Sequence, residues 1–117
     1  PWDIPLDLAN SLMGIISINL LHVASWNSAK SLFRESGKLL KKEKFLMLYG
    51  PFKIDNKHTS QSNYLFDNSL KFQNHLWGIR NIEEVSEEAE RNGFFEENII
   101  SMPANNFSII YKKFRDN

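Results

Sequence analysis

Apolar runs alternate with amphipathic stretches along most of the chain. Residues 14–23, GIISINLLHV, form a continuous apolar run nearly free of charge, which predicts a strand buried on both faces, as in the centre of a parallel sheet. Residues 26–41 then carry apolar side chains at helical spacing directly after Ser25, a favourable helix N-cap. Residues 45–49 form a second apolar run. A strand, a helix and a strand in this order predict a right-handed parallel crossover.

Two more helices are predicted in the middle of the chain. The first has Leu65, Phe66 and Leu70 on its buried face. The second begins at Asn81, whose spacing from Glu84 matches a capping box, and ends at Gly93, a residue type suited to the end of a helix. Both helices therefore precede the last apolar segments of the chain.

The C-terminal part of the chain predicts a hairpin. Residues 94–102 and 107–114 are strand-like runs, and the PANN sequence at 103–106 between them favours a turn. No linker or internal repeat divides the 117 residues, so we expect a single domain, 1–117. The predicted fold class is α/β, with parallel strands followed by helices and an antiparallel hairpin. Class I S-adenosylmethionine (SAM) dependent methyltransferases also have an antiparallel strand at the C-terminal end of their fold.

Charge and residue usage narrow the classes of function. Fourteen basic and fourteen acidic residues cancel, so no overall basic field favours nucleic acid as a partner. The chain has no cysteine, which excludes disulfides, thiolate zinc sites and a cysteine nucleophile, and we expect a cytoplasmic protein. The three histidines lack a metal-ligand spacing, and the longest apolar run is too short to span a membrane. We expect neither a metal site nor a membrane partner.

Four motifs in order carry a specific resemblance over nearly the whole chain. They are INLLHVASW at 18–26, LYGPFKIDNKHTSQSN at 48–63, WGIRNIEEV at 77–85 and MPANN at 102–106. In these motifs the chain resembles the methyltransferase-like twenty-six family of SAM-dependent methyltransferases. The resemblance implies a Rossmann-like fold with SAM as cofactor. It implies that residues 15–23 are the fourth strand, residues 45–50 the fifth, and the final hairpin the sixth and seventh.

One element of such a methyltransferase is missing from the sequence. The cofactor turn after the first strand needs closely spaced glycines, and the five glycines here stand apart, at positions 14, 37, 50, 78 and 93. We therefore expect the chain to be the C-terminal half of the domain, to bind SAM poorly and to be inactive by itself. The fourth strand would then expose an apolar edge, through which we expect self-association.

Ligands of open α/β sheets bind at the carboxyl ends of the parallel strands, which fall here near residues 19–22 and 49–52. Asn19 and Leu20 are the candidate cofactor-binding residues. His22 is the candidate catalytic base, because an imidazole accepts a proton near neutral pH. A structural role for Asn19 and His22, tying down loop backbone, carries about equal weight.

The candidate substrate-binding residues come from the second strand end and the loop that follows it, which we expect to act as a lid over the ligand. Each has a structural alternative: aromatic residues at strand ends often belong to the core, polar loop residues cap helices, and an arginine can stack on Trp77 as a clasp. The candidates are Tyr49, Gly50, Pro51, Phe52, His58, Thr59, Ser60, Asn63 and Arg80.

The predicted function is methyl transfer from SAM to an unidentified small-molecule or macromolecular acceptor, carried out by the complete protein. Two alternatives remain open. One is a non-catalytic Rossmann-like interaction module that keeps the fold as a scaffold. The other is half of a nucleotide-binding oxidoreductase, because a dinucleotide-binding fold shares the same parallel strands and crossover helix.

Overall fold

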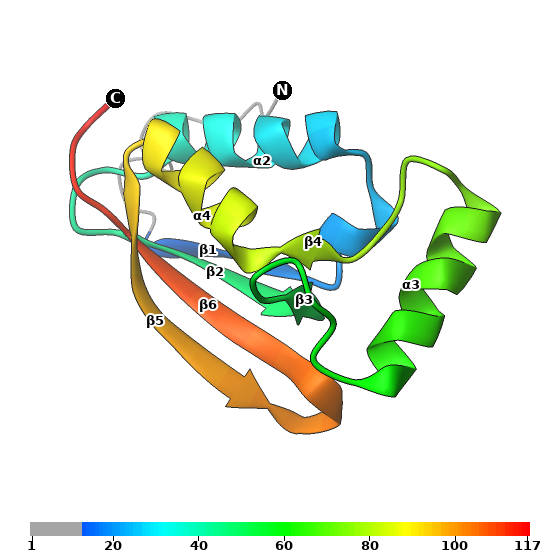
Figure 1. Cartoon of the computed structure of the whole chain (residues 1–117). Coiled ribbons are helices and arrows are strands. Elements are labelled where there is room, and N and C mark those ends of the chain that lie inside the picture. Colours follow the sequence, from blue (N-terminus) through cyan, green and yellow to red (C-terminus); the bar gives the residue numbers. More distant parts are fainter. Residues whose placement is uncertain (1–12) are drawn as a thin grey trace.

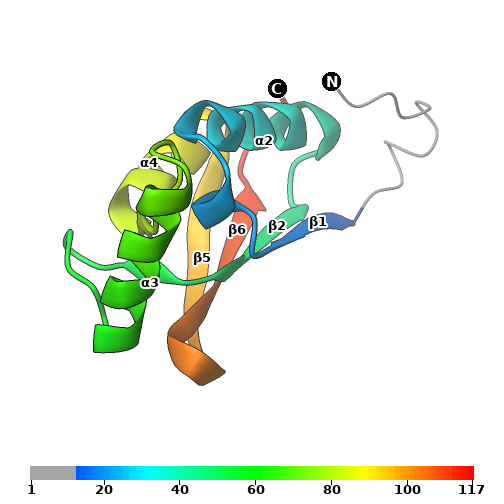
Figure 2. The same ribbon diagram turned by 90° about the vertical axis from the view of Figure 1, so that its right-hand side faces the viewer.

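The computed structural model describes residues 13–117, which form a main sheet of four strands. The strand order is β1-β2-β6-β5, and Figure 2 shows the strands side by side in this order. β1 and β2 are parallel, whereas β6 runs antiparallel to both of its neighbours. The strands are β1 (Gly14–Ile18), β2 (Phe45–Gly50), β5 (Phe94–Met102) and β6 (Asn106–Lys113).

The helices lie to one side of the sheet and at one end of it. Helices α2 (Trp26–Leu39) and α4 (Ile82–Arg91) cover one face, and α3 (Gln61–Gln73) stands beyond the end of the sheet (Figure 1). Two short strands, β3 (Phe52–Lys53) and β4 (Arg80–Asn81), pair in parallel between them. The predicted crossover and the predicted C-terminal hairpin are both confirmed.

The hydrophobic core lies between the sheet and helices α2 and α4. Its fully buried members come from all of these elements, because alternate residues of each strand point toward the helices. Tyr111 adds a polar group: its hydroxyl lies 2.9 Å from Ser86 Oγ, and burial raises its pKa. The best-buried apolar residues are Phe33, Leu40, Leu46, Leu48, Val85, Ala89, Phe94 and Ile109.

Helix α2 begins as the sequence predicts and ends two residues earlier than predicted. Ser25 Oγ accepts a hydrogen bond from the Ser28 N–H and caps the first turn. At the other end, the fully buried Lys113 donates to the carbonyls of Gly37 and Leu40, at 2.7 and 3.0 Å. These carbonyls lack helical partners, so a cation at this end stabilises the helix.

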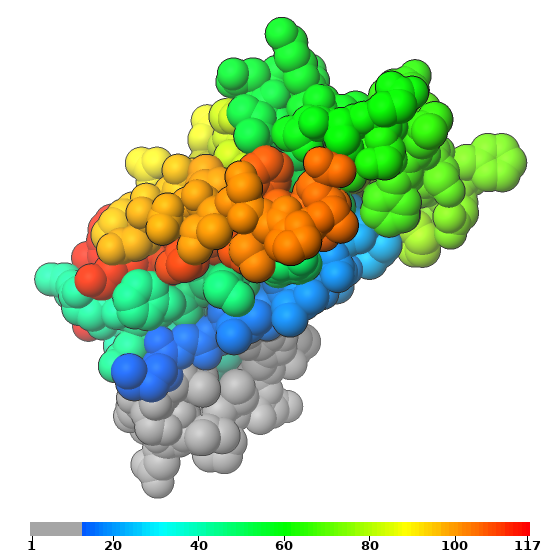
Figure 3. Space-filling model, turned by 90° about the horizontal axis from the view of Figure 1, so that it is seen from below, coloured from blue at the N-terminus to red at the C-terminus, as the bar shows by residue number. Residues whose placement is uncertain are grey.

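The sequence predicts that the first apolar run is one strand buried on both faces, and this prediction is wrong. β1 stops at Ile18, and residues 21–23 form a 3-10 turn. Ile16 and Ile18 are each 63% exposed, since β1 is the edge strand among the described residues and the helices cover only its other face. Figure 3 shows the side of the sheet that faces away from α2 and α4. Self-association through the β1 edge stays a prediction.

The buried face of α3 agrees with the predicted one only in part. Leu70 is buried as predicted, but Leu65 and Phe66 are 58% and 42% exposed, and Asn63 and Asp67 point inward instead. These two polar side chains point inward because α3 packs partly on polar loop backbone, with which they form hydrogen bonds. Helical spacing alone does not distinguish these two surroundings.

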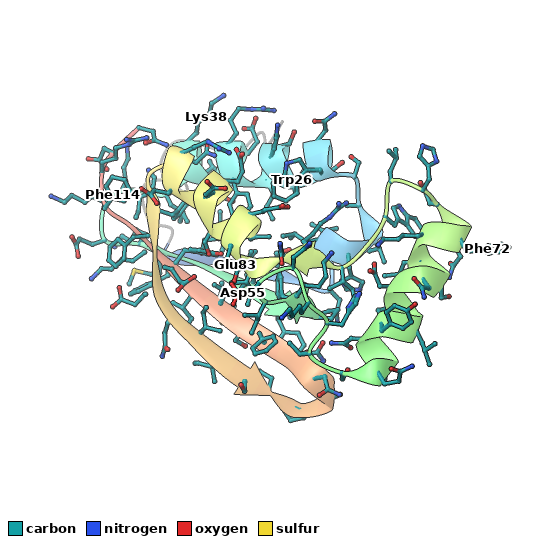
Figure 4. The ribbon with its side chains drawn as sticks, in the orientation of Figure 1. Trp26, Lys38, Asp55, Phe72, Glu83 and Phe114 are labelled. Carbon is teal, nitrogen blue, oxygen red and sulfur yellow. The ribbon has the colours of Figure 1, made fainter. Side chains whose placement is uncertain are left out.

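The predicted start of α4 is correct, but the predicted capping-box hydrogen bond of Asn81 does not form. Asn81 is the N-cap residue, but its side chain makes no cap bond. Its Oδ1 accepts instead from the Asn56 N–H at 2.8 Å, and Glu83 Oε1 accepts from the Asp55 N–H at 2.9 Å. Figure 4 shows Asp55 next to Glu83. The turn at residues 54–57 is thus bound to α4, which argues against the predicted lid.

Candidate functional site

The carboxyl ends of the two parallel strands lie together, as the open-sheet rule requires. The Asn19 N–H donates to the Tyr49 carbonyl at 2.8 Å and joins the two ends. A cleft of about 410 Å³ opens at this edge, between the strand ends, α3 and the tip of the β5–β6 hairpin. It is lined by Asn19, His22, Pro51, Asn63, Phe66, Ala104 and Asn106.

His22 lies in the 3-10 turn that follows β1 and is only 7% exposed. Burial lowers the pKa of its imidazole below the ordinary value of 6.5, so the ring is neutral near pH 7. The ring meets Phe66 edge to face, with 5.6 Å between the centroids. A neutral histidine held in this way can accept a proton from a ligand in the cleft.

Gly50 keeps the space between the two polar side chains open. A Cβ at this position would lie 3.6 Å from Asn19 Oδ1 and 3.7 Å from His22 Nδ1. The space would hold a methyl group, but L side chains rarely adopt the backbone conformation of Gly50, so a substitution there would be strained. Pro51, the next residue, ends β2 and lines the cleft itself.

Arg80 fixes the turn that carries His22. Its guanidinium donates to the carbonyls of Leu21, Ala24 and Leu76 at 3.3, 2.7 and 2.8 Å. It also lies 5.8 Å from the ring centre of Trp26. Arg80 is therefore a clasp on backbone carbonyls, and its aromatic partner is Trp26 rather than the predicted Trp77.

Asp67 attaches α3 to the rest of the molecule. Its carboxylate is 1% exposed and accepts from the Ile79 N–H at 2.8 Å, while His58 Nε2 and Lys71 Nζ each lie 3.0 Å away. Burial raises the pKa of Asp67, but the hydrogen bonds from Ile79 and Lys71 with the nearby positive charge outweigh it, and the pKa is lowered. Asp67 is thus an anchor for the helix that brings Phe66 to the cleft.

The predicted site residues separate into two groups. Asn19, His22, Pro51 and Asn63 line the cleft, Gly50 lies beside it, and the Tyr49 hydroxyl is 3.5 Å from Asn106 Nδ2. Leu20 is 44% exposed at the same edge. The remaining predicted residues hold the structure around the cleft. Phe52 is in the core, His58 binds Asp67, Thr59 accepts from Asn63, Ser60 caps α3, and Arg80 binds carbonyls.

Three lining residues are absent from the predicted set: Phe66, Ala104 and Asn106. Phe66 has the spacing of a core residue, and periodicity gives no sign that its face turns to a cleft. Ala104 and Asn106 belong to the MPANN motif, which carries the resemblance, but the turn sequence alone indicates only a hairpin. Their contact with the parallel strand ends depends on the sheet order.

Two further properties of residues 13–117 bear on the kind of site. They contain no group of three or more acidic, histidine or cysteine side chains arranged to hold a metal ion. No helix among them is long and apolar enough to cross a bilayer. The cleft is therefore described by its carboxamides, its imidazole and its aromatic ring.

Residues 1–113 match the protein family described as "Protein of unknown function (DUF938)". The match covers nearly all of the chain, and the chain belongs to this family.

Solved structures with a similar fold include methyltransferases. An O-methyltransferase family 2 protein from Planctomyces limnophilus, in complex with apigenin, has a TM-score of 0.77 at 16% identity, over 86% of this chain and 30% of its own. The mitomycin 7-O-methyltransferase MmcR has a TM-score of 0.73 at 14% identity, over 92% of this chain and 32% of its own. CalO1, a methyltransferase of calicheamicin biosynthesis bound to SAH, has a TM-score of 0.72 at 6% identity, over 92% of this chain and 32% of its own.

These likenesses establish the fold. The chain has the mixed α/β fold of the C-terminal portions of class I methyltransferase structures. It spans about a third of the length of the solved chains it matches.

Proposed function

We propose that the cleft is part of the active site of a SAM-dependent methyltransferase, and that the complete protein methylates a hydroxyl group of a small acceptor. The observation that carries the proposal is the buried, neutral His22 at the carboxyl end of β1, in a fold shared with O-methyltransferases. Within the DUF938 family, the four motifs favour the narrower methyltransferase-like twenty-six group. A cytoplasmic location is part of the same proposal.

The chemistry of the cleft favours an uncharged acceptor with an O–H group. Its lining offers the carboxamides of Asn19, Asn63 and Asn106, one imidazole and one phenyl ring. Arg80, which binds the turn that carries His22, is engaged by three carbonyls. A carboxylate or phosphate would find no cation on the lining, whereas a hydroxyl finds both hydrogen-bonding groups and a base.

The residues at the β1 end fit one side of a SAM molecule. Asn19 is exposed there and supplies a carboxamide with both donors and an acceptor, and the exposed Leu20 supplies an apolar surface for a purine ring. SAM carries a methyl group on a sulfonium centre, which is ready for transfer to a nucleophile. The remaining contacts of such a cofactor would come from elements other than β1 and β2.

The described residues supply positioning and proton transfer. His22 is placed to take the proton from the acceptor hydroxyl, and SAM, when held against Asn19 and Leu20, would supply the methyl group to that oxygen. Phe66 packs against His22 and screens the ring from water. Because methyl transfer depends mainly on placing and desolvating two reactants, these roles do not require a fixed sequence signature.

The proposal is tested by transfer of radiolabelled methyl from SAM to a panel of small phenols and alcohols, with the protein at its full native length. We expect His22→Ala to lower kcat by about a hundredfold or more, the usual contribution of a general base. His75→Ala is the matched control, because His75 is exposed and lies outside the cleft lining. Equal kcat in both variants, or no transfer to any acceptor, would contradict the proposal and favour the scaffold alternative.

A further inference from the structure

The tip of the β5–β6 hairpin holds an alanine in an unfavourable conformation. Ala104 has φ 61° and ψ 34°, and Asn105 follows with φ 60°. Left-handed backbone is tolerated by glycine and asparagine but costs an alanine about 1 kcal/mol or more, because its Cβ approaches the next carbonyl oxygen. The position therefore accepts a strain that two other residue types would remove.

Three hydrogen bonds impose this conformation on the tip. Asn63 Nδ2, on α3, donates to the Asn105 carbonyl at 3.1 Å. Asn106 Nδ2 lies 3.3 Å from the Pro103 carbonyl and 3.5 Å from the hydroxyl of Tyr49. The tip is thus tied both to α3 and to the end of β2, and its geometry is set by its neighbours.

Stability does not explain why this position carries a methyl group. Ala104 is exposed, so its Cβ buries little apolar surface that could offset the strain. It does line the cleft, on the side opposite to the β1 end. The partner that would benefit from the methyl group is a ligand in the cleft.

We propose that Ala104 is the residue that determines the size of the acceptor, and that Asn63 is the positioning residue that holds it in place. This inference rests on the proposed function, since it identifies which side of the cleft receives the acceptor. The rigid tip forms a wall, and the methyl group of Ala104 sets how far a bound ring extends from His22 toward the hairpin.

The test measures binding to the 117-residue chain without SAM, using phenol, 1-naphthol and 9-phenanthrol as probes of increasing size and chemical shift titration to give Kd. The variant Ala104→Asn keeps the left-handed backbone and adds volume. We expect it to raise the Kd of 1-naphthol about tenfold and to change the Kd of phenol little, because a few added atoms exclude a larger ring from a tight pocket. Ala104→Gly removes volume, and we expect it to strengthen 9-phenanthrol about tenfold relative to phenol.

Two controls separate size from folding. Asn105→Gly changes the other left-handed residue of the tip, which does not line the cleft, and should leave all three Kd values unchanged. Thermal unfolding should show both Ala104 variants at least as stable as the unsubstituted chain, because both relieve strain. Identical Kd values in all variants, or no binding of any probe to the unsubstituted chain, would overturn the inference.

The two proposals can fail separately. A size-dependent change in Kd without any methyl transfer would support the role of Ala104 and contradict the proposed methyltransferase function. Methyl transfer that depends on His22, with no effect of the Ala104 variants on how Kd depends on probe size, would support the methyltransferase function and contradict the role of Ala104.

Discussion

Replacing Asp67 with alanine is expected to lower the free energy of unfolding by about 3 kcal/mol, the largest effect of any polar substitution we propose. The variant leaves the Ile79 N–H without its acceptor in a buried site and removes the shared partner of His58 and Lys71. Urea denaturation measures the change. The conservative Asp67→Asn should lose less, because its amide oxygen can still accept from Ile79.

The same site gives a pH dependence with a definite sign. The pKa of Asp67 in the folded chain lies below its ordinary value of 3.8, so the folded state favours the carboxylate. Its contribution is complete above the unfolded pKa and is lost as the pH falls through the folded pKa. The stability advantage over Asp67→Asn should therefore shrink as the pH falls below about 4. An advantage that grows on acidification would contradict the assignment.

The control for this experiment is Lys71→Met. Lys71 is half exposed, so its ion pair with Asp67 is screened by solvent and worth less than about 1 kcal/mol. A loss in Lys71→Met as large as that in Asp67→Ala would show that the buried N–H bond is not the main contribution.

Replacing Arg80 with lysine is the second substitution with a large expected effect, about 2 kcal/mol in the free energy of unfolding. A single ammonium cannot span the carbonyls of Leu21, Ala24 and Leu76, and at least one would lose its donor. The turn that carries His22 should loosen as a result. Chemical denaturation reports the loss of stability, and the His22 ring resonances report the change in the site.

Arg34→Lys is the matched control for Arg80. Arg34 is exposed on α2 and donates to Ser31 of its own helix, so its replacement should change stability by less than about 0.5 kcal/mol. If Arg80→Lys left both the stability and the His22 resonances as they are, Arg80 would not be the clasp that its contacts indicate.

The sequence predicts elements well where the signal is local. Ser25 caps α2 as expected, because the bond from the Ser28 N–H forms within one turn of the chain. Asn81 also marks a helix start, yet its side chain bonds to Asn56, and no local pattern predicts a partner brought there by the fold. The hairpin is predicted for the same reason as the Ser25 cap: its turn residues and strands are contiguous.

The site is predicted in part. The open-sheet rule selects His22 and Asn19 because both stand near the predicted end of a parallel strand, although β1 ends at Ile18, before the end of its apolar run. Phe66 and Ala104 escape the same reasoning, because their place in the cleft depends on how α3 and the hairpin tip pack against the strand ends. Arg80 shows the reverse case, in which a cationic side chain suited to a ligand is used by backbone carbonyls.

The proposed function requires that ligands bind at the carboxyl ends of β1 and β2. The most direct measurement is a crystal structure of the protein at its full native length with S-adenosylhomocysteine and 1-naphthol. We expect S-adenosylhomocysteine against Asn19 and Leu20, with the naphthol hydroxyl within hydrogen-bond distance of His22 and its ring between Phe66 and Ala104. Ligands bound at another edge of the sheet, with this cleft left to solvent, would contradict it.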